Sequence, residues 1–134
     1  LIRELIALAR SREIDGRPAI EHGSIRQRIA ALAIEAQALR HTQYRHVTRR
    51  VRGEPGPEAS VAKLFGTELN LRIMRLAGDL LGPEGLVERA RGSTDESSKW
   101  LRRILAARAF TIGGGTSEVQ RNIIGERALR LPRG

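Results

Sequence analysis

The sequence predicts an all-α domain, an antiparallel four-helix-bundle-like arrangement of long helices that takes in all of residues 1–134. Apolar residues recur at alternating spacings of three and four along most of the chain, which is the period of an amphipathic helix. Glycine and proline clusters interrupt this pattern, and no stretch has the alternation of a strand. Aromatic residues make up only 3% of the chain, so the core must consist mainly of Leu, Ile, Val and Ala. Four main helices with mostly short connections favour an antiparallel bundle.

The first segment, residues 1–11, has the apolar pattern of a helix already under way at its first residue, which is not Met. We therefore expect the sequence to be a piece of a longer protein. Residues 12–23 form a polar loop, because Asp15-Gly16 indicates a turn and Pro18 prevents a continuous helix.

A long second helix is expected from Ser24, since Ser24 and Gln27 form the signature of a capping box. Its apolar face extends over about seven turns. The residues on that face are Ile25, Ile29, Leu32, Ala36, Leu39, Val47 and Val51. His41 and His46 lie near the polar side, with no acid or cysteine at ligand spacing, so we predict surface histidines and no metal site.

The third helix follows the break at residues 53–57, with Pro57 suited to its first position and Glu58 to its positive end. Its apolar face comprises Val61, Phe65, Leu69, Ile73, Leu76 and Leu80. A second set of apolar residues widens this face, namely Leu64, Leu71, Met74 and Leu81. We therefore expect the helix to be central, or buried against a partner subunit as well, and to end at residues 82–85.

Residues 87–98 show no periodicity and are expected to form an exposed loop, with Asp95 or Ser97 as the cap of a fourth helix. The apolar side of that helix comprises Leu101, Ile104, Leu105, Ala109 and Ile112. After residues 113–115, which are all glycine, a last helix is expected to run to Pro132. Its apolar residues are Val119, Ile123, Ile124, Ala128 and Leu131.

The composition favours anionic partners without identifying one. The net charge is +9, from 24 basic residues of which only two are lysine. Such a surface attracts nucleic acid or a phosphate-bearing cofactor or substrate. The chain has no cysteine, which is compatible with a reducing compartment such as the cytoplasm. No apolar run approaches the roughly 20 residues of a membrane span.

The triple glycine and the residues that follow it form the most distinctive stretch of the chain. Thr116 or Ser117 can cap the helix that begins here, and Ser117 with Gln120 fits a capping box. Exposed N–H groups at such a helix start attract phosphate or another anion. An ordinary tight corner explains two glycines, whereas a third indicates a ligand or a neighbouring chain close to the backbone.

Common catalytic motifs are missing from the chain. It contains no P-loop, no dinucleotide fingerprint after a strand, and no nucleophile elbow. The best candidates for binding an anion are Arg12, whose guanidinium can grip phosphate by two bonds, and the N–H donors of Gly115 and Thr116.

Residues 114–133, Gly-Gly-Thr-Ser-Glu-Val-Gln-Arg-Asn-Ile-Ile-Gly-Glu-Arg-Ala-Leu-Arg-Leu-Pro-Arg, closely resemble the carboxy-terminal signature of the flavin-dependent acyl-CoA dehydrogenases. The segment from Arg12 to Ile25 is similar to the family's R-x-x-F-G-x-x-x-x-x-H-Q-x-I motif. Residues 58–63 and 80–85 fall where the family has its third-helix lysine motif and its Q-x-x-G-G-x-G motif. The matches are in order and span nearly the whole chain.

The resemblance implies the C-terminal helical domain of a three-domain FAD enzyme that desaturates an acyl-CoA, normally a tetramer built from dimers. Arg12 would then reach the FAD pyrophosphate of a neighbouring subunit, with His22 in the same loop. Asp79 and Gly82 would face the partner's cofactor. The chain's own FAD would lie on Gly115, Thr116 and Glu118. The implied partners are an acyl-CoA substrate, an electron-transfer flavoprotein or similar acceptor, and further subunits, identical or different.

This sequence departs from the family pattern at several of these positions. Asp79 replaces a glutamine and Pro83 the second glycine of the glycine motif, and an acid facing a pyrophosphate is unfavourable. Gly114 stands where many relatives have the glutamate that removes the α-proton, while others carry that base on an earlier helix. No catalytic residue is therefore predicted within these 134 residues, and we expect the chain alone to be inactive.

A second hypothesis is a non-catalytic, basic helical module that binds nucleic acid or another protein. It predicts arginines gathered on one helix face, whereas here they are distributed over the polar side of every helix. The sequence therefore favours the flavoprotein domain, without nucleic acid as a partner.

Overall fold

The computed structural model describes residues 1–54, 56–87 and 93–132, and in this part of the chain α-helices dominate. The α-helices are α1 (Ile2–Ser11), α2 (Gly23–Val51), α3 (Glu58–Leu81), α4 (Glu96–Ile112) and α5 (Ser117–Arg127). Short 3₁₀ helices are η1 (Ala19–Glu21) and η2 (Gly82–Leu86). The strands β1 (Glu13–Ile14) and β2 (Arg17–Pro18) pair antiparallel, Glu13 with Pro18 and Ile14 with Arg17.

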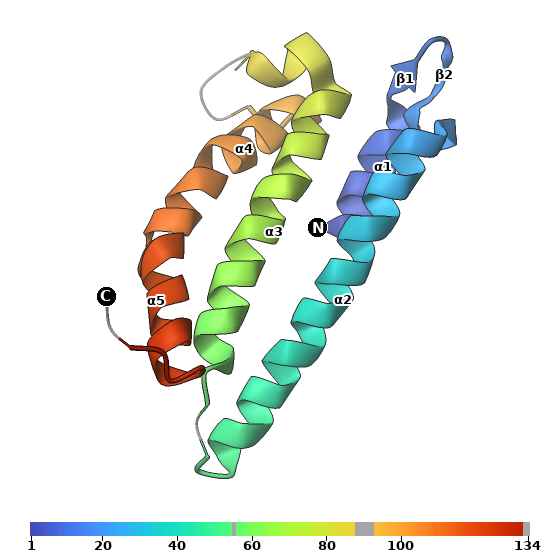
Figure 1. Ribbon diagram of the computed structural model, residues 1–134. Coiled ribbons are helices and arrows are strands. Elements are labelled where there is room, and N and C mark those ends of the chain that lie inside the picture. The colour runs from blue at the N-terminus through green and yellow to red at the C-terminus, as the bar shows by residue number, and fades with distance from the viewer. Residues whose placement is uncertain (55, 88–92, 133–134) are drawn as a thin grey trace.

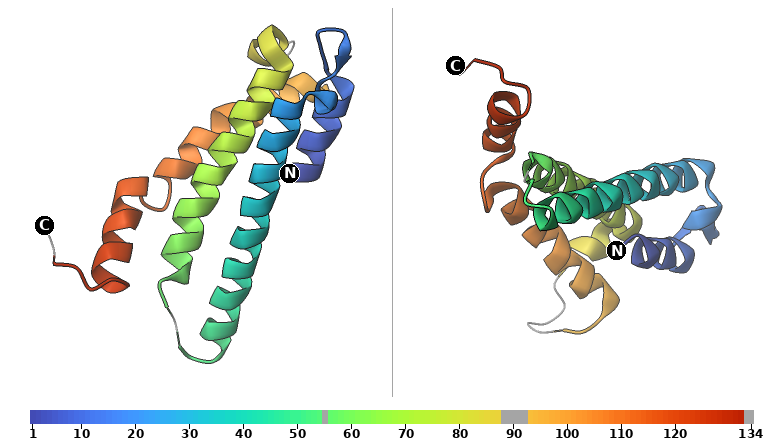
Figure 2. Two further views of the ribbon diagram at one scale, coloured as in Figure 1. Left: turned by 45° about the vertical axis from the view of Figure 1, so that its right-hand side comes forward. Right: turned by 90° about the horizontal axis from the view of Figure 1, so that it is seen from below.

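The arrangement confirms the predicted all-α bundle, and α3 is its central helix (Figure 1). It packs against α1, α2, α4 and α5. The hairpin and η2 lie at one end of the bundle, and the connection between α2 and α3 lies at the other (Figure 1). Seen along the bundle, α1 and α5 are on opposite sides of the central helix (Figure 2).

The core follows from the apolar faces that the sequence indicates. Leu5, Leu8 and Leu76 are fully buried, and Trp100 is almost so. Half of the other buried core residues come from α3, between Leu69 and its end. These residues are Leu69, Ile73, Met74, Ala77, Leu80 and Leu81. Met74 and Leu81, which we expected to widen the helix for a subunit contact, therefore pack mostly inside the chain's own core.

The long face predicted on α2 is confirmed as far as Leu39 and is wrong at Val47 and Val51. Ile25, Ile29 and Leu32 are buried, but Val47 and Val51 are exposed. In the described part of the chain, α1 lies beside the first part of α2 (Figure 1). Beyond it, α2 has contacts with α3 on one side, where Leu39 lies against Gly66.

Three helix N-termini test the caps that the sequence predicts. The capping box at Ser24 is wrong, because α2 begins at Gly23 with His22 as the N-cap. Thr116, one of the two predicted candidates, is the cap of α5 and accepts from the N–H of Val119, so the alternative capping box at Ser117 is wrong. Asp95, one of the two predicted candidates, is the cap of α4, and its side chain accepts a hydrogen bond from the N–H of Ser98.

The last helix is shorter than predicted and ends at Arg127 instead of continuing to Pro132. Arg130 has a φ of 56°, a left-handed conformation that no helix continues through. The chain turns back there, and the N–H of Leu131 donates to the carbonyl of Gly125 at 3.0 Å.

The loop regions bring two more corrections. The sequence did not indicate the two-residue strands, which form around Asp15 and Gly16, both with positive φ as in a tight hairpin turn. Of the loop expected at 87–98, residues 96–98 are the first turn of α4, and residues 88–92 lie outside the described residues. No helix in the described ranges has the length and apolar character needed to cross a membrane.

Leu76 provides a test of the central role of α3. Because its side chain is fully buried, Leu76→Ala should lower the free energy of unfolding by about 2–5 kcal/mol. The matched control is Leu86→Ala, at a residue 83% exposed, which should change stability by less than about 0.5 kcal/mol. Chemical denaturation followed by circular dichroism measures both, and equal losses would contradict the assignment of the core.

Candidate functional site

The candidate residues fall into two groups at opposite ends of α3. Arg12, His22, Asp79 and Gly82 lie at the end that carries the hairpin and η2, here called the hairpin end. Gly115, Thr116 and Glu118 lie at the start of α5, here called the corner end, beside the first turns of α3. At about 1.5 Å per helical residue, the 19 residues from Lys63 to Gly82 separate the two ends by roughly 28 Å. One small ligand cannot contact both groups within one chain.

Arg12 is the C-cap residue of α1 and projects between η2 and the start of α4. Its Nη1 donates to Glu84 Oε2 at 2.8 Å, and its Nη2 donates to Ser97 Oγ at 3.2 Å. Its Nε is buried and has no hydrogen-bond partner among the described residues. The guanidinium is therefore held in place with one donor still unused, as an anion-binding arginine requires.

His22 supports this end of the bundle instead of presenting a free ring. Its Nε2 lies 2.8 Å from the carbonyl oxygen of Ile14, so the ring connects the first turn of α2 to the hairpin. The N–H of Ala19 also donates to the carbonyl of Arg12 at 2.7 Å. These contacts fix the loop that carries Arg12.

Asp79 does not stand as an isolated acid at the hairpin end. Arg28 of α2 donates from Nη2 to Asp79 Oδ2 at 2.6 Å, and both side chains are about half exposed. Gly82 is the C-cap of α3 with φ of 56° and ψ of −141°, a conformation that side chains disfavour. Sequence reasoning missed both Arg28 and Glu84, because they lie 51 and 72 residues from their partners.

The glycine corner is held by two side chains that sequence reasoning did not assign to it. Gln120 Nε2 donates to the carbonyl of Gly114 at 3.0 Å, and Lys63 Nζ donates to the carbonyl of Gly115. A Cβ on Gly115 would lie 2.7 Å from Gln120 Nε2, and its φ is 101°. The third glycine therefore has a structural explanation within this chain, which is the close approach of Gln120.

Glu118 occupies the positive end of α5 with its own carboxylate. Its pKa is lowered from the ordinary value, first by the hydrogen bond from its own backbone N–H, then by the Thr116 hydroxyl and more weakly by Arg121. Thr116 Oγ1 also accepts from the N–H of Val119 at 3.3 Å. An anion at this helix start would compete with Glu118.

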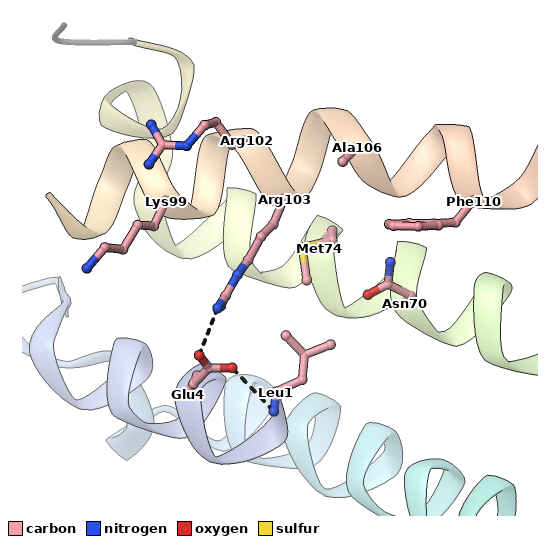
Figure 3. A pocket seen from close by; sticks show the side chains of 9 residues that line it. All are labelled: Leu1, Glu4, Asn70, Met74, Lys99, Arg102, Arg103, Ala106 and Phe110. Atoms are coloured by element: carbon pink, nitrogen blue, oxygen red, sulfur yellow. Dashed lines mark hydrogen bonds and ion pairs between the residues drawn. The ribbon is translucent and has the colours of Figure 1, made fainter. Parts of the chain in front are cut away.

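The cavity between α1 and α4 contains none of the candidate residues (Figure 3). Its volume is about 580 Å³. Met74, Ala106 and Phe110 form apolar parts of its wall, and a single ion pair crosses it, from Arg103 Nη2 to Glu4 Oε1 at 3.0 Å. Among the described residues that line it, Glu4 alone carries a carboxylate.

The sequence model described as "Acyl-CoA dehydrogenase, C-terminal domain" matches residues 1–129. Acyl-CoA dehydrogenase IpdE1 of Mycolicibacterium smegmatis is 39% identical over 109 residues, which are 81% of this chain and 26% of that protein. Acyl-CoA dehydrogenase FadE26 of Mycobacterium tuberculosis is 42% identical over 80 residues, 59% of this chain and 20% of that protein. The chain thus spans about a fifth to a quarter of the length of these relatives.

Solved structures show the same fold. The ChsE4-ChsE5 complex from Mycobacterium tuberculosis matches with a TM-score of 0.81 and 31% identity, over 99% of this chain and 35% of that one. Butyryl-CoA dehydrogenase from Megasphaera elsdenii matches with a TM-score of 0.77 and 23% identity, over 96% of this chain and 32% of that one. At 23% identity, the match to butyryl-CoA dehydrogenase shows only that the two chains share a fold.

A glycine series tests the geometry of the corner. Gly115→Ala should destabilise the protein by at least about 1–2 kcal/mol, since its positive φ disfavours a side chain and the added Cβ would meet Gln120. Gly114→Ala, with a φ of 70° but open space, should cost less. Gly23→Ala is the matched control, because Gly23 has negative φ, lies in α2 and has no atom near a new Cβ. Thermal unfolding of the three variants measures the order of their losses of stability. If Gly23→Ala were the most destabilising of the three, the predicted order would be contradicted.

Proposed function

The chain belongs to the acyl-CoA dehydrogenase family, as the C-terminal domain of that family, and on this premise we propose that it binds FAD and joins subunits in an enzyme that desaturates an acyl-CoA thioester. The enzyme is proposed to be a longer, three-domain protein, which agrees with the lengths of the relatives. The observation that carries the proposal is Arg12, a fixed arginine with an unused buried donor at the end of the bundle where the family motif places the pyrophosphate.

The geometry of the two ends supports contacts with two cofactors. Arg12 would contact the pyrophosphate of a neighbouring subunit's FAD, with His22 fixing its loop and Asp79 and Gly82 nearby. At the other end, Gly115, Thr116 and Glu118 would contact the chain's own FAD. Because the ends are roughly 28 Å apart along α3, each complete site would draw its residues from two chains.

The residues present fit the dinucleotide in kind. A guanidinium with a free N–H donates to phosphate oxygens, while a carboxylate such as Glu118 accepts from hydroxyl groups, as on a ribose. FAD, when bound, supplies the hydride acceptor of the reaction. This chain supplies binding and orientation only, because Gly114 has no side chain that could take the α-proton. We propose that the base is a glutamate outside these 134 residues or on a partner subunit.

The assembly is proposed to be a dimer or tetramer of identical or different subunits. Several large apolar side chains of α2, α4 and α5 are exposed, among them Val51, Ile112 and Phe110. Exposed apolar groups on several helices favour burial against another chain. The solved relative ChsE4-ChsE5 is a complex of two different subunits. In the proposed reaction, an electron-transfer flavoprotein or similar acceptor would oxidise the reduced enzyme.

The alternative, a basic module for nucleic acid, is disfavoured by the pairing of the arginines. Arg28, Arg72, Arg103 and Arg121 each bind a carboxylate on another helix. Arg45 and Arg49 share Glu58. The paired carboxylates lower the positive charge that this surface presents, and so weaken its attraction for the phosphates of a nucleic acid.

The substitution Arg12→Ala in the full-length protein tests the proposal. Loss of a charge-assisted phosphate bond should cost roughly 1.5–3 kcal/mol, so FAD retention should fall about tenfold or more. Titration of the apoprotein with FAD, followed by flavin fluorescence, gives the dissociation constant. Arg17→Ala, an exposed arginine in the same hairpin, is the control. Unchanged FAD affinity in Arg12→Ala would show that this loop does not bind the cofactor.

The isolated 134-residue chain provides a second test. It should not bleach added FAD in the presence of a panel of acyl-CoAs, since Gly114 offers no base and half of each site would be missing. Anaerobic absorbance at the flavin band measures this, with the full-length enzyme as the positive control. Turnover by the isolated chain would mean that a base lies within these residues.

A further inference from the structure

Glu84 stands in the place that the proposed function gives to a ligand. Its carboxylate takes the Nη1 donor of Arg12 at 2.8 Å, so the arginine expected to hold a phosphate already holds an anion. We propose that Glu84 is an affinity-determining residue, which competes with the cofactor's pyrophosphate for Arg12 and thereby weakens FAD binding at the hairpin end. This inference rests on the proposed function and concerns how tightly the same site holds its ligand.

The backbone of η2 aims Glu84 at Arg12. Gly82 begins the turn with a φ of 56° and a ψ of −141°, and Pro83 has the fixed φ of its ring. Gly85 is buried, and a Cβ on it would lie 2.8 Å from the Cβ of Leu81. The turn is thus packed tightly on the last residue of α3, and the carboxylate of Glu84 is presented by a rigid support.

The two partners differ in how freely they can move. The side chain of Arg12 is 23% exposed and also bonds to Ser97, whereas that of Glu84 is 52% exposed. A phosphate that approaches from solvent can therefore displace Glu84 while Arg12 stays bound to Ser97.

The charges of the neighbouring residues make this competition specific to Glu84. Asp79, the acid among the candidate residues at this end, is paired with Arg28 at 2.6 Å and has its own cation. Removing Glu84 would leave the charge of Arg12 without a carboxylate partner at the place where the phosphate is expected. An exposed ion pair is weak, so a phosphate can displace the carboxylate at a small cost.

The experiment compares FAD dissociation constants of the full-length protein with those of Glu84→Gln and Glu84→Ala. Glu84→Gln removes the charge, and Glu84→Ala removes the acceptor as well. Since surface ion pairs contribute up to about 1 kcal/mol, binding should tighten about two- to fivefold. Glu21→Gln, an exposed acid at the same end with the same change in charge, is the control and should leave the constant unchanged.

The double variant Arg12→Ala/Glu84→Gln separates competition from simple repulsion. If Glu84 acts through Arg12, the gain of Glu84→Gln disappears in the Arg12→Ala background. A gain that persists there, or that Glu21→Gln reproduces, would overturn the inference. The inference would also be overturned if Arg12→Ala lost FAD while both Glu84 variants bound FAD as tightly as the unchanged protein, or more weakly. That outcome would leave the proposed function intact. Unchanged binding in Arg12→Ala itself would contradict both. Circular dichroism checks the fold of each variant. Because Glu84 is exposed, its substitution should leave the fold intact.

Discussion

The burial of α3 is the constraint on which the rest of the structure depends. It is in contact with every other α-helix, and much of its second half lies in the core. Trp100 of α4 and Leu5 and Leu8 of α1 complete the core that it organises. A helix of 24 residues that is anchored in the core also fixes the distance between the elements at its two ends. The hairpin end and the corner end therefore keep their separation as long as the core is intact.

Charge pairs between helices then fix how the surrounding helices lie against α3. Glu58, only 4% exposed at the first turn of α3, binds Arg49 at 2.9 Å and Arg45 at 3.2 Å, both from α2. The pKa of Glu58 is lowered, first by its own backbone N–H and then by these arginines, while burial acts in the opposite direction. Because the folded-state pKa is the lower one, this contribution to stability is complete near neutral pH and is lost as the pH falls through the folded-state value.

The sequence predicted those features that depend on local periodicity, and missed those that depend on distant residues. The fold class, the central helix and the end of α3 at Leu81 follow from apolar spacing and from glycine and proline. The sequence did not predict His22 as the N-cap of α2, because the contact between His22 and the hairpin forms only in the folded chain. Arg12 was identifiable as a candidate from its motif, but its contact with Glu84 joins residues 72 positions apart. The contact of Lys63 with Gly115 spans 52 positions, so its part in the corner was equally invisible.

The family resemblance assigned one set of candidate residues to a neighbouring subunit's FAD and the other set to the chain's own FAD, and the two sets lie at opposite ends of α3. In the structure, α3 holds them apart, and each end has its own counter-charges, Glu84 at the hairpin end and Glu118 at the corner end. A ligand that used both kinds of residue would have to lie between two chains. On the proposed function, cofactor binding and subunit association are therefore a single, coupled event.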